Sequence, residues 1–249
     1  MTSRRLVCVA NAVLLLTLAA AGSRAAAQTP NEIGAWDGLV LSPVGALPPM
    51  ARAPVTAGAT TDEIAIRYGR WRYDPDDAVH DDIGLTWTRR LGFARSRLSL
   101  TGAYSLVECP TCSAWASGAF EIESTLWEYG DAPESPRPFR SAVSVRMSAG
   151  GAHYLGPDPS TTGSSAIVLP ITLGVALGRL STLRASIEPG FGYGHVTGAD
   201  FASGGFLPMI GGAASLMAGP RVALNFGVQR VMLTGAPTVV GAALSWKLR

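Results

Sequence analysis

The stretch TLRASIEPGFGYGH, from Thr182 to His195, constrains the fold of this chain more than any other. Apolar side chains alternate along it with small or polar residues that include Arg184 and Glu188. Because successive side chains of a strand point to opposite faces, this pattern predicts a β-strand with one apolar face. That face ends in Phe191 and Tyr193. An aromatic end is typical of a strand that crosses a bilayer, with lipid outside and a polar lumen inside.

Nine further segments show a similar alternation, one of them poorly patterned and rich in glycine. With the stretch above, the predicted strands are residues 63–73, 83–91, 97–107, 114–128, 140–153, 166–178, 182–195, 206–217, 221–232 and 238–248. Each is near the roughly 9–11 residues that a tilted transmembrane strand needs. Residues 62–249 are therefore predicted to form a single antiparallel up-and-down transmembrane β-barrel of about ten strands, in an all-β chain. Eight strands is the alternative, because the link after residue 128 is long where a short turn is expected.

The N-terminus has the pattern of a signal peptide. Arg4 and Arg5 precede the apolar run 9–21, and the small residues 25–27 supply an A-x-A cleavage site. We therefore expect residues 1–27 to be removed on export. The alternative, a membrane-anchoring first helix, would need an apolar run of about 18 residues or more.

Loss of this segment would change the charge of the chain. It contains three of the 20 basic residues and none of the 18 acidic ones, which leaves 20 − 3 = 17 basic residues and a net charge of −1. No basic stripe remains that would indicate a nucleic-acid partner. The most apolar later segment, 166–178, is interrupted by Pro170 and is too short for a helical span. An exported apolar chain of this kind favours a transmembrane barrel.

Two short features lie outside the strand pattern. Residues 28–61 are rich in Pro, Ala and Gly and are predicted to be an extended or flexible leader, with a short plug or one extra strand as alternatives. Cys109 and Cys112 are expected to form a small loop-bracing disulfide rather than a redox or metal site. No metal site is predicted, since zinc would need four ligands and no second cysteine pair exists. No cofactor is predicted either.

The signal peptide, the alternating strands and the terminal strand VVGAALSWKLR resemble the small outer-membrane β-barrel proteins of Gram-negative-type bacteria. Members of that family usually end on an aromatic residue that assists recognition by the barrel assembly machinery. Here Trp246 and Leu248 hold outward positions, and the last residue is Arg249. The resemblance implies outer-membrane lipid and the assembly machinery as partners. The family includes pores, adhesion or stress-related barrels and a few lipid-modifying enzymes, so membership does not select a function.

Charged residues fall on the face that is predicted to line the lumen. Buried charges must be paired and hydrogen-bonded, so in a barrel this narrow they are expected to fill the lumen rather than to line an open pore. A conducting pore with an ion preference is the alternative. The predicted lumen-lining residues are Arg67, Arg90, Glu121, Glu123, Arg146, Arg184 and Glu188.

A weaker pattern concerns catalysis. His195 and Thr197, in YGHVTGAD, resemble the His-x-Ser arrangement of outer-membrane lipid A deacylases, with Thr in place of Ser. Glu188 on the same strand is the acidic candidate to orient the histidine. A histidine at a strand–loop junction is ordinary, so no catalytic residue is assigned.

The lead prediction is a non-enzymatic, porin-like protein integral to the cell outer membrane, structural or weakly pore-forming. One alternative is a lipid A deacylase-like hydrolase. The other is a soluble periplasmic lipocalin-like barrel, which would carry its apolar face inward.

Overall fold

The computed structural model describes eleven strands, a short helix and parts of the segments between them. The described residues are 38–53, 55, 60–73, 78–91, 95–108, 114–130, 139–156, 160–177, 181–198, 202–219, 221–233 and 236–248. The predicted signal peptide and the predicted disulfide Cys109–Cys112 lie outside them. No helix among the described residues has the length and apolarity needed to cross a membrane.

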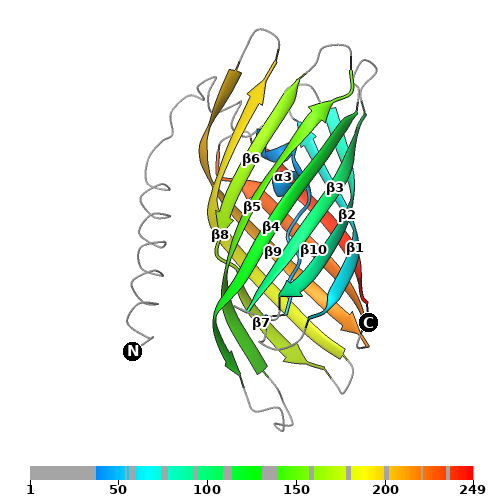
Figure 1. Cartoon of the computed structure of the whole chain (residues 1–249), viewed down its shortest axis with the longest axis vertical. Coiled ribbons are helices and arrows are strands. Elements are labelled where there is room, and N and C mark those ends of the chain that lie inside the picture. Colours follow the sequence, from blue (N-terminus) through cyan, green and yellow to red (C-terminus); the bar gives the residue numbers. More distant parts are fainter. Residues whose placement is uncertain are drawn as a thin grey trace.

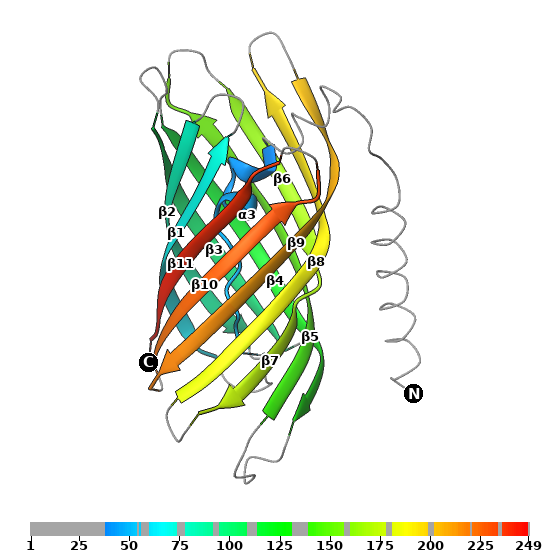
Figure 2. The ribbon, with the colours of Figure 1, turned by 180° about the vertical axis from the view of Figure 1, so that it is seen from behind.

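The strands form one closed antiparallel barrel (Figures 1 and 2). Apart from β6 and β7, each strand pairs with the next strand in sequence, and the first pairs with the last from Glu63↔Lys247 to Arg70↔Val240. The strands are β1 (Asp62–Tyr73), β2 (Ala78–Leu91), β3 (Ser96–Glu108), β4 (Trp115–Gly130), β5 (Phe139–Tyr154), β6 (Thr161–Val168), β7 (Ile171–Ala176), β8 (Ser181–Thr197), β9 (Ala202–Ala218), β10 (Val222–Val231) and β11 (Thr238–Lys247).

Ten strand positions make the ring, because β6 and β7 share one position. Both pair with β5 on one side and with β8 on the other. Pro170 separates them, since proline has no N–H to donate to a ladder. The wall stays hydrogen-bonded at the break: Leu169 N donates to Pro189 O at 2.8 Å, and Ser144 N donates to Pro170 O at 2.9 Å. The prediction of about ten antiparallel strands is confirmed.

Several strands extend further than the sequence pattern predicts. The ladder of β2 begins at Ala78, five residues before the predicted start, and takes in His80, Asp81 and Asp82. β9 begins at Ala202 rather than at 206. These segments were predicted as loops because they are polar. Polarity does not distinguish a loop from a strand when one face of the strand lines a polar lumen.

We call the end of the barrel where β1 begins and β11 ends the base, and the opposite end the top. At the base Leu248 N donates to Asp62 O at 2.7 Å, which joins the two ends of the sheet. In Figure 1 the base is the lower end.

The apolar face of the wall points outward. In β2, Leu85 is 58 % exposed, whereas its neighbour Thr86 is 1 % exposed. This arrangement is the one expected of a barrel in lipid, and it is the reverse of the soluble lipocalin-like alternative. Large side chains on the exposed face include Ile66, Leu85, Leu100, Phe120, Ile167, Ile187, Phe226 and Leu244.

A charged substitution on this face should cost stability in proportion to its depth. We expect Leu85→Arg, near the middle of β2, to lower the free energy of unfolding by about 2–4 kcal/mol. Leu248→Arg, an exposed position at the base, should cost only about 0–1 kcal/mol. Urea unfolding in lipid vesicles measures both. Equal costs at the two positions would contradict a membrane-spanning wall.

Candidate functional site

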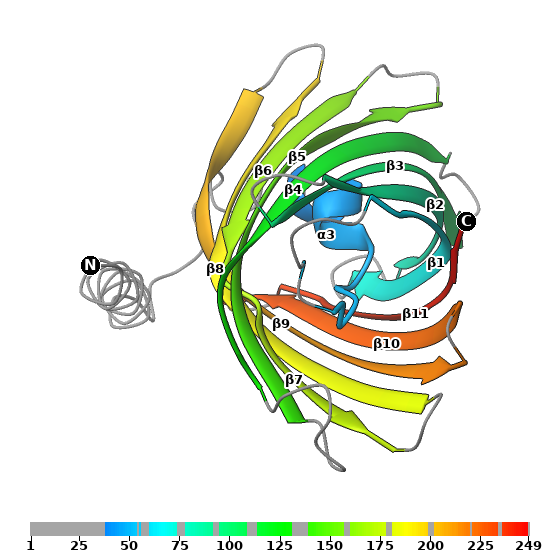
Figure 3. The same cartoon turned by 60° about the horizontal axis from the view of Figure 1, so that its bottom comes forward.

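The lumen is occupied by the chain itself. The segment 38–53, followed by Val55, lies inside the barrel, and its short helix α3 (Pro43–Ala46) is enclosed by the ring of strands in Figure 3. We call residues 38–55 the plug segment. Leu39 and Val55 are both 0 % exposed. This part of the Pro/Ala-rich segment therefore occupies the position of a short plug, one of the alternatives that the sequence left open.

The plug segment runs from the top to the base. Gly38 lies against the backbone of His195, close to the top end of β8. At the other end, Val55 N donates to Thr125 Oγ1 at 2.9 Å, near the base end of β4. The lumen is thus filled along most of its length.

An apolar cluster closes the lumen towards the top. Side chains of the plug segment pack there against inward-facing side chains of β1, β9, β10 and β11. Trp71 belongs to this cluster and donates from Nε1 to Asp82 Oδ2 at 2.9 Å. The buried members are Leu39, Val40, Trp71, Leu207, Val231, Ala236 and Val239.

Backbone carbonyls of the plug segment are bound by side chains of the wall. Arg67 Nη2 donates to Leu47 O at 2.8 Å and to Pro48 O at 2.6 Å. Gln229 Nε2 donates to Val44 O at 3.1 Å. Buried backbone polar groups need such partners, and the prolines of the segment have no N–H that would need one. A proline-rich chain therefore suits a lumen rich in donors.

Two wall glycines allow the plug segment to approach the sheet closely. A Cβ atom at Gly69 would lie 2.1 Å from Ala46 O, and one at Gly227 would lie 2.4 Å from Pro49 O. Neither distance can be tolerated, so any larger residue at these positions has to displace the plug segment.

Ion pairs tie the plug segment to the middle of the lumen. Arg52 Nη1 lies 2.9 Å from Glu121 Oε1, and Arg146 Nε lies 3.5 Å from Glu121 Oε2. Arg146 also pairs with Glu188, which accepts a further hydrogen bond from Ser186 at 3.1 Å. Four charges of alternating sign thus form one chain from plug to wall. Each is buried or nearly so, and each has an opposite charge beside it, as burial requires.

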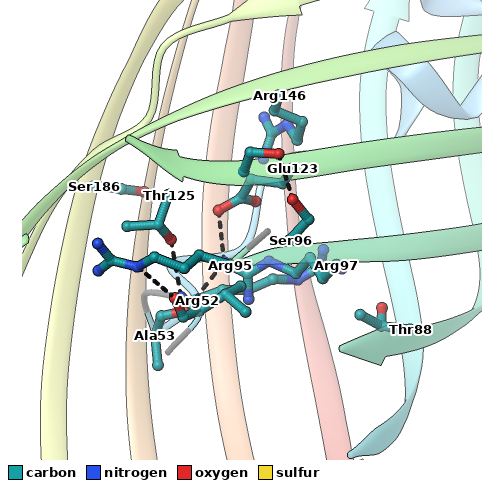
Figure 4. A network of polar contacts seen from close by, with 12 residues as sticks. Arg52, Ala53, Thr88, Arg95, Ser96, Arg97, Glu123, Thr125, Arg146 and Ser186 are labelled. Atoms are coloured by element: carbon teal, nitrogen blue, oxygen red, sulfur yellow. Dashed lines mark hydrogen bonds and ion pairs between the residues drawn. The ribbon is translucent and has the colours of Figure 1, made fainter. Parts of the chain in front are cut away.

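A second pair lies nearer the base and contacts the plug segment at its end. Arg97 Nη2 is 2.5 Å from Glu123 Oε1 and donates to Ala53 O at 3.0 Å. Figure 4 shows this network around Arg52, Arg97 and Glu123. The remaining cavity in the middle of the lumen, lined by Arg67, Glu121 and Arg146 among others, has a volume of about 40 Å³. That volume holds only a few water molecules.

The seven charged residues that the sequence assigns to the lumen all have positions on its inner face. Arg67, Glu121, Glu123, Arg146 and Glu188 belong to the contacts described above. Arg90 and Arg184 lie together at the base, around a second cavity.

The weak catalytic candidates do not come together. Glu188 is 2 % exposed and faces the lumen, whereas His195 and Thr197 are exposed on the outer face of β8. Residues an odd number of positions apart on a strand point to opposite faces, so Glu188 cannot orient His195. Within the described ranges, no three His, Cys, Asp or Glu side chains are placed to hold a metal ion.

Sequence reasoning missed the polar cluster around Asp82. His80 stacks on Trp71 with ring centroids 3.7 Å apart, and Ser105 Oγ lies 3.5 Å from His80 Nδ1. His80 and Asp82 share the inner face of β2, which their spacing of two would have indicated had the segment been predicted as a strand. Arg52 was missed as well, because a leader gives no reason to expect a partner for it.

Comparison with known proteins gives similarities of structure only. No protein-family model matches the sequence, and no curated protein sequence matches it. The translocator domain of the autotransporter NalP from Neisseria meningitidis aligns over 78 % of this chain and 89 % of its own, with 9 % identity and a TM-score of 0.45. Ail, the attachment invasion locus protein of Yersinia pestis, aligns over 78 % of this chain and 100 % of its own, with 6 % identity and a TM-score of 0.38. At these values the similarities assign no function.

Removal of the shared carboxylate should destabilise the lumen. We expect Glu121→Ala to lower the free energy of unfolding by about 3–5 kcal/mol, because it leaves Arg52 and Arg146 buried with one partner fewer. The matched control is Glu108→Ala, whose carboxylate is 64 % exposed and 3.9 Å from Arg70, and which should change little. Urea unfolding in detergent micelles compares them. Similar losses for both variants would show that the ion-pair chain contributes nothing special.

Proposed function

We propose that this protein is an integral outer-membrane β-barrel, structural and non-enzymatic, whose lumen is closed by its own plug segment. The observation that carries the proposal is the continuous set of contacts between residues 38–55 and the inner wall. Weak pore formation then depends on displacement of the plug segment, and the resting protein does not conduct.

The wall supports the membrane location. It is closed, so every described strand has a hydrogen-bonded neighbour on each side, and it presents a band of exposed apolar side chains. With the predicted export signal at residues 1–27, these features favour the cell outer membrane as the location. Outer-membrane lipid and the barrel assembly machinery are then the partners, and the top end faces the cell surface.

The chemistry of the lumen supports closure rather than conduction. An ion path needs charged or polar groups that are free to exchange partners with a passing ion. Here Arg146 forms ion pairs with Glu121 and Glu188, and Glu121 also pairs with Arg52 of the plug segment. Glu188 and His195 lie on opposite faces of the wall, so this pair does not support the lipid A deacylase-like alternative.

Conductance in planar lipid bilayers tests the proposal. The intact chain should give no steady single-channel current, and the double variant Gly69→Val/Gly227→Val should conduct, because both added side chains collide with the plug segment. Gly102→Val is the matched control, since a Cβ atom there meets nothing within 4 Å. Steady current through the intact chain would overturn the proposal.

A disulfide should lock the plug segment in place. Ser42 and Ser164 share a hydrogen bond with their Oγ atoms 2.5 Å apart. In a background without Cys109 and Cys112, the pair Ser42→Cys/Ser164→Cys should oxidise in intact outer membranes and change electrophoretic mobility on reduction. Ser42→Cys/Ser245→Cys is the control, because Ser245 lies near the base of β11. Absence of the first cross-link, or equal yields for both pairs, would contradict the location of the plug segment inside the lumen.

A further inference from the structure

We propose that the base of the lumen is a binding site for a phosphate-type oxyanion. The site is the cavity of about 20 Å³ beneath the plug segment, which we call the vestibule. Of the ion-pair chain in the middle of the lumen, only Arg52 also lines the vestibule, and the closure proposed above does not require a ligand there. Its charged lining residues are Arg52, Glu63, Arg90, Arg97, Arg184, Arg221 and Lys247.

The cations of the vestibule come from opposite sides of the barrel. Arg90 on β2 lies directly across from Arg97 on β3 in the strand register. Arg184 is near the start of β8, Arg221 immediately precedes β10, and Lys247 ends β11. Like charges directly opposite each other in a sheet are destabilising, so the fold brings these groups together at a cost.

The vestibule has more positive than negative charge. Arg52 and Arg97 pair with Glu121 and Glu123. The side chains of the other four cations make no ion pair with any other described residue, and Glu63 is the acidic group that lines the cavity with them. Four cations against one carboxylate leave an excess of three positive charges. In the middle of the lumen, by contrast, charges of opposite sign alternate.

Two buried donors also lack a partner. Arg52 Nε and Arg97 Nε are buried, and neither is hydrogen-bonded within the described part of the chain. The whole of Arg97 is 3 % exposed. A buried donor without an acceptor costs free energy, and both donors belong to side chains that line the vestibule.

These features select the class of ligand. Guanidinium groups offer planar forks of N–H donors that match the oxygens of phosphate, and such charge-assisted bonds are strong. An excess of three positive charges favours a multivalent anion over chloride. A phosphate dianion supplies both the charge and several acceptors. The phosphate could belong to a lipid headgroup or be free in solution, and the chemistry of recognition is the same.

Titration with inorganic phosphate tests the site. The full chain is purified in uncharged detergent micelles, and its thermal unfolding midpoint is measured against sodium phosphate or sodium chloride at equal ionic strength. We expect a saturable rise with phosphate that chloride does not reproduce. Binding should weaken at least tenfold, on the order of 1.4 kcal/mol, in Arg90→Gln/Arg184→Gln. Arg230→Gln, which removes one charge from the exposed face near the top, should bind like the parent.

The variants carry a second readout. Without phosphate, Arg90→Gln/Arg184→Gln should unfold at the same or a higher temperature than the parent, because it relieves repulsion. Lys247→Gln gives an independent variant should the double one not fold. Equal shifts with phosphate and chloride, or undiminished phosphate binding in the variants, would overturn the proposal.

A lipid arm identifies the source of the phosphate. Micelles are doped with phosphatidic acid or with an uncharged diacylglycerol, and the phosphate titration is repeated. Competition by phosphatidic acid alone assigns the site to a lipid headgroup, and unchanged binding of inorganic phosphate assigns it to the soluble ion.

Discussion

The pairing of β1 with β11 is the contact on which the rest of the structure depends. It joins residues about 180 positions apart and removes the two edges that an open sheet of this length would expose. Once the sheet is closed, the period of two divides every strand between an outside and an inside. Along the middle of the wall the outside is apolar, so charged side chains there, such as Arg67, Glu121 and Arg146, lie inside. Closure therefore produces a narrow lumen lined by Arg and Glu side chains, each of which needs a partner because it is buried.

The plug segment and the ion pairs solve that problem together. The inner wall has more cations than carboxylates to pair with them. Carbonyl oxygens of the plug segment accept hydrogen bonds from some of these cations instead. Arg67 illustrates this: it donates to Leu47 O and Pro48 O, and no ion pair in the described part of the chain includes it. A segment rich in proline and alanine supplies carbonyls that need hydrogen-bond donors, and it adds little bulk. The same composition that predicts an unstructured leader in water therefore suits a filler inside a barrel.

The difference between what could and could not be predicted follows from the range of the interactions. Alternation is local, so the ten strand positions and the inward side of Arg67, Glu121 and Arg146 follow from the sequence. The plug contacts join residues about 20 to 185 positions apart and have no local pattern. The cluster of Trp71, His80 and Asp82 was missed because the polar top end of a strand has the same amino-acid composition as a loop.

Charge changes along the axis of the lumen, and this gradient gives the plug segment a direction. Its apolar residues, Leu39 and Val40, lie towards the top, where they pack against apolar side chains of the wall. Its one described cation, Arg52, lies lower, between Glu121 and the positive vestibule. A reversed segment would place an arginine among apolar side chains and leave Glu121 with one cation fewer. The order of residues in the plug segment therefore matches the wall. The cations at the base that pair neither with the plug segment nor with a carboxylate account for the excess positive charge there.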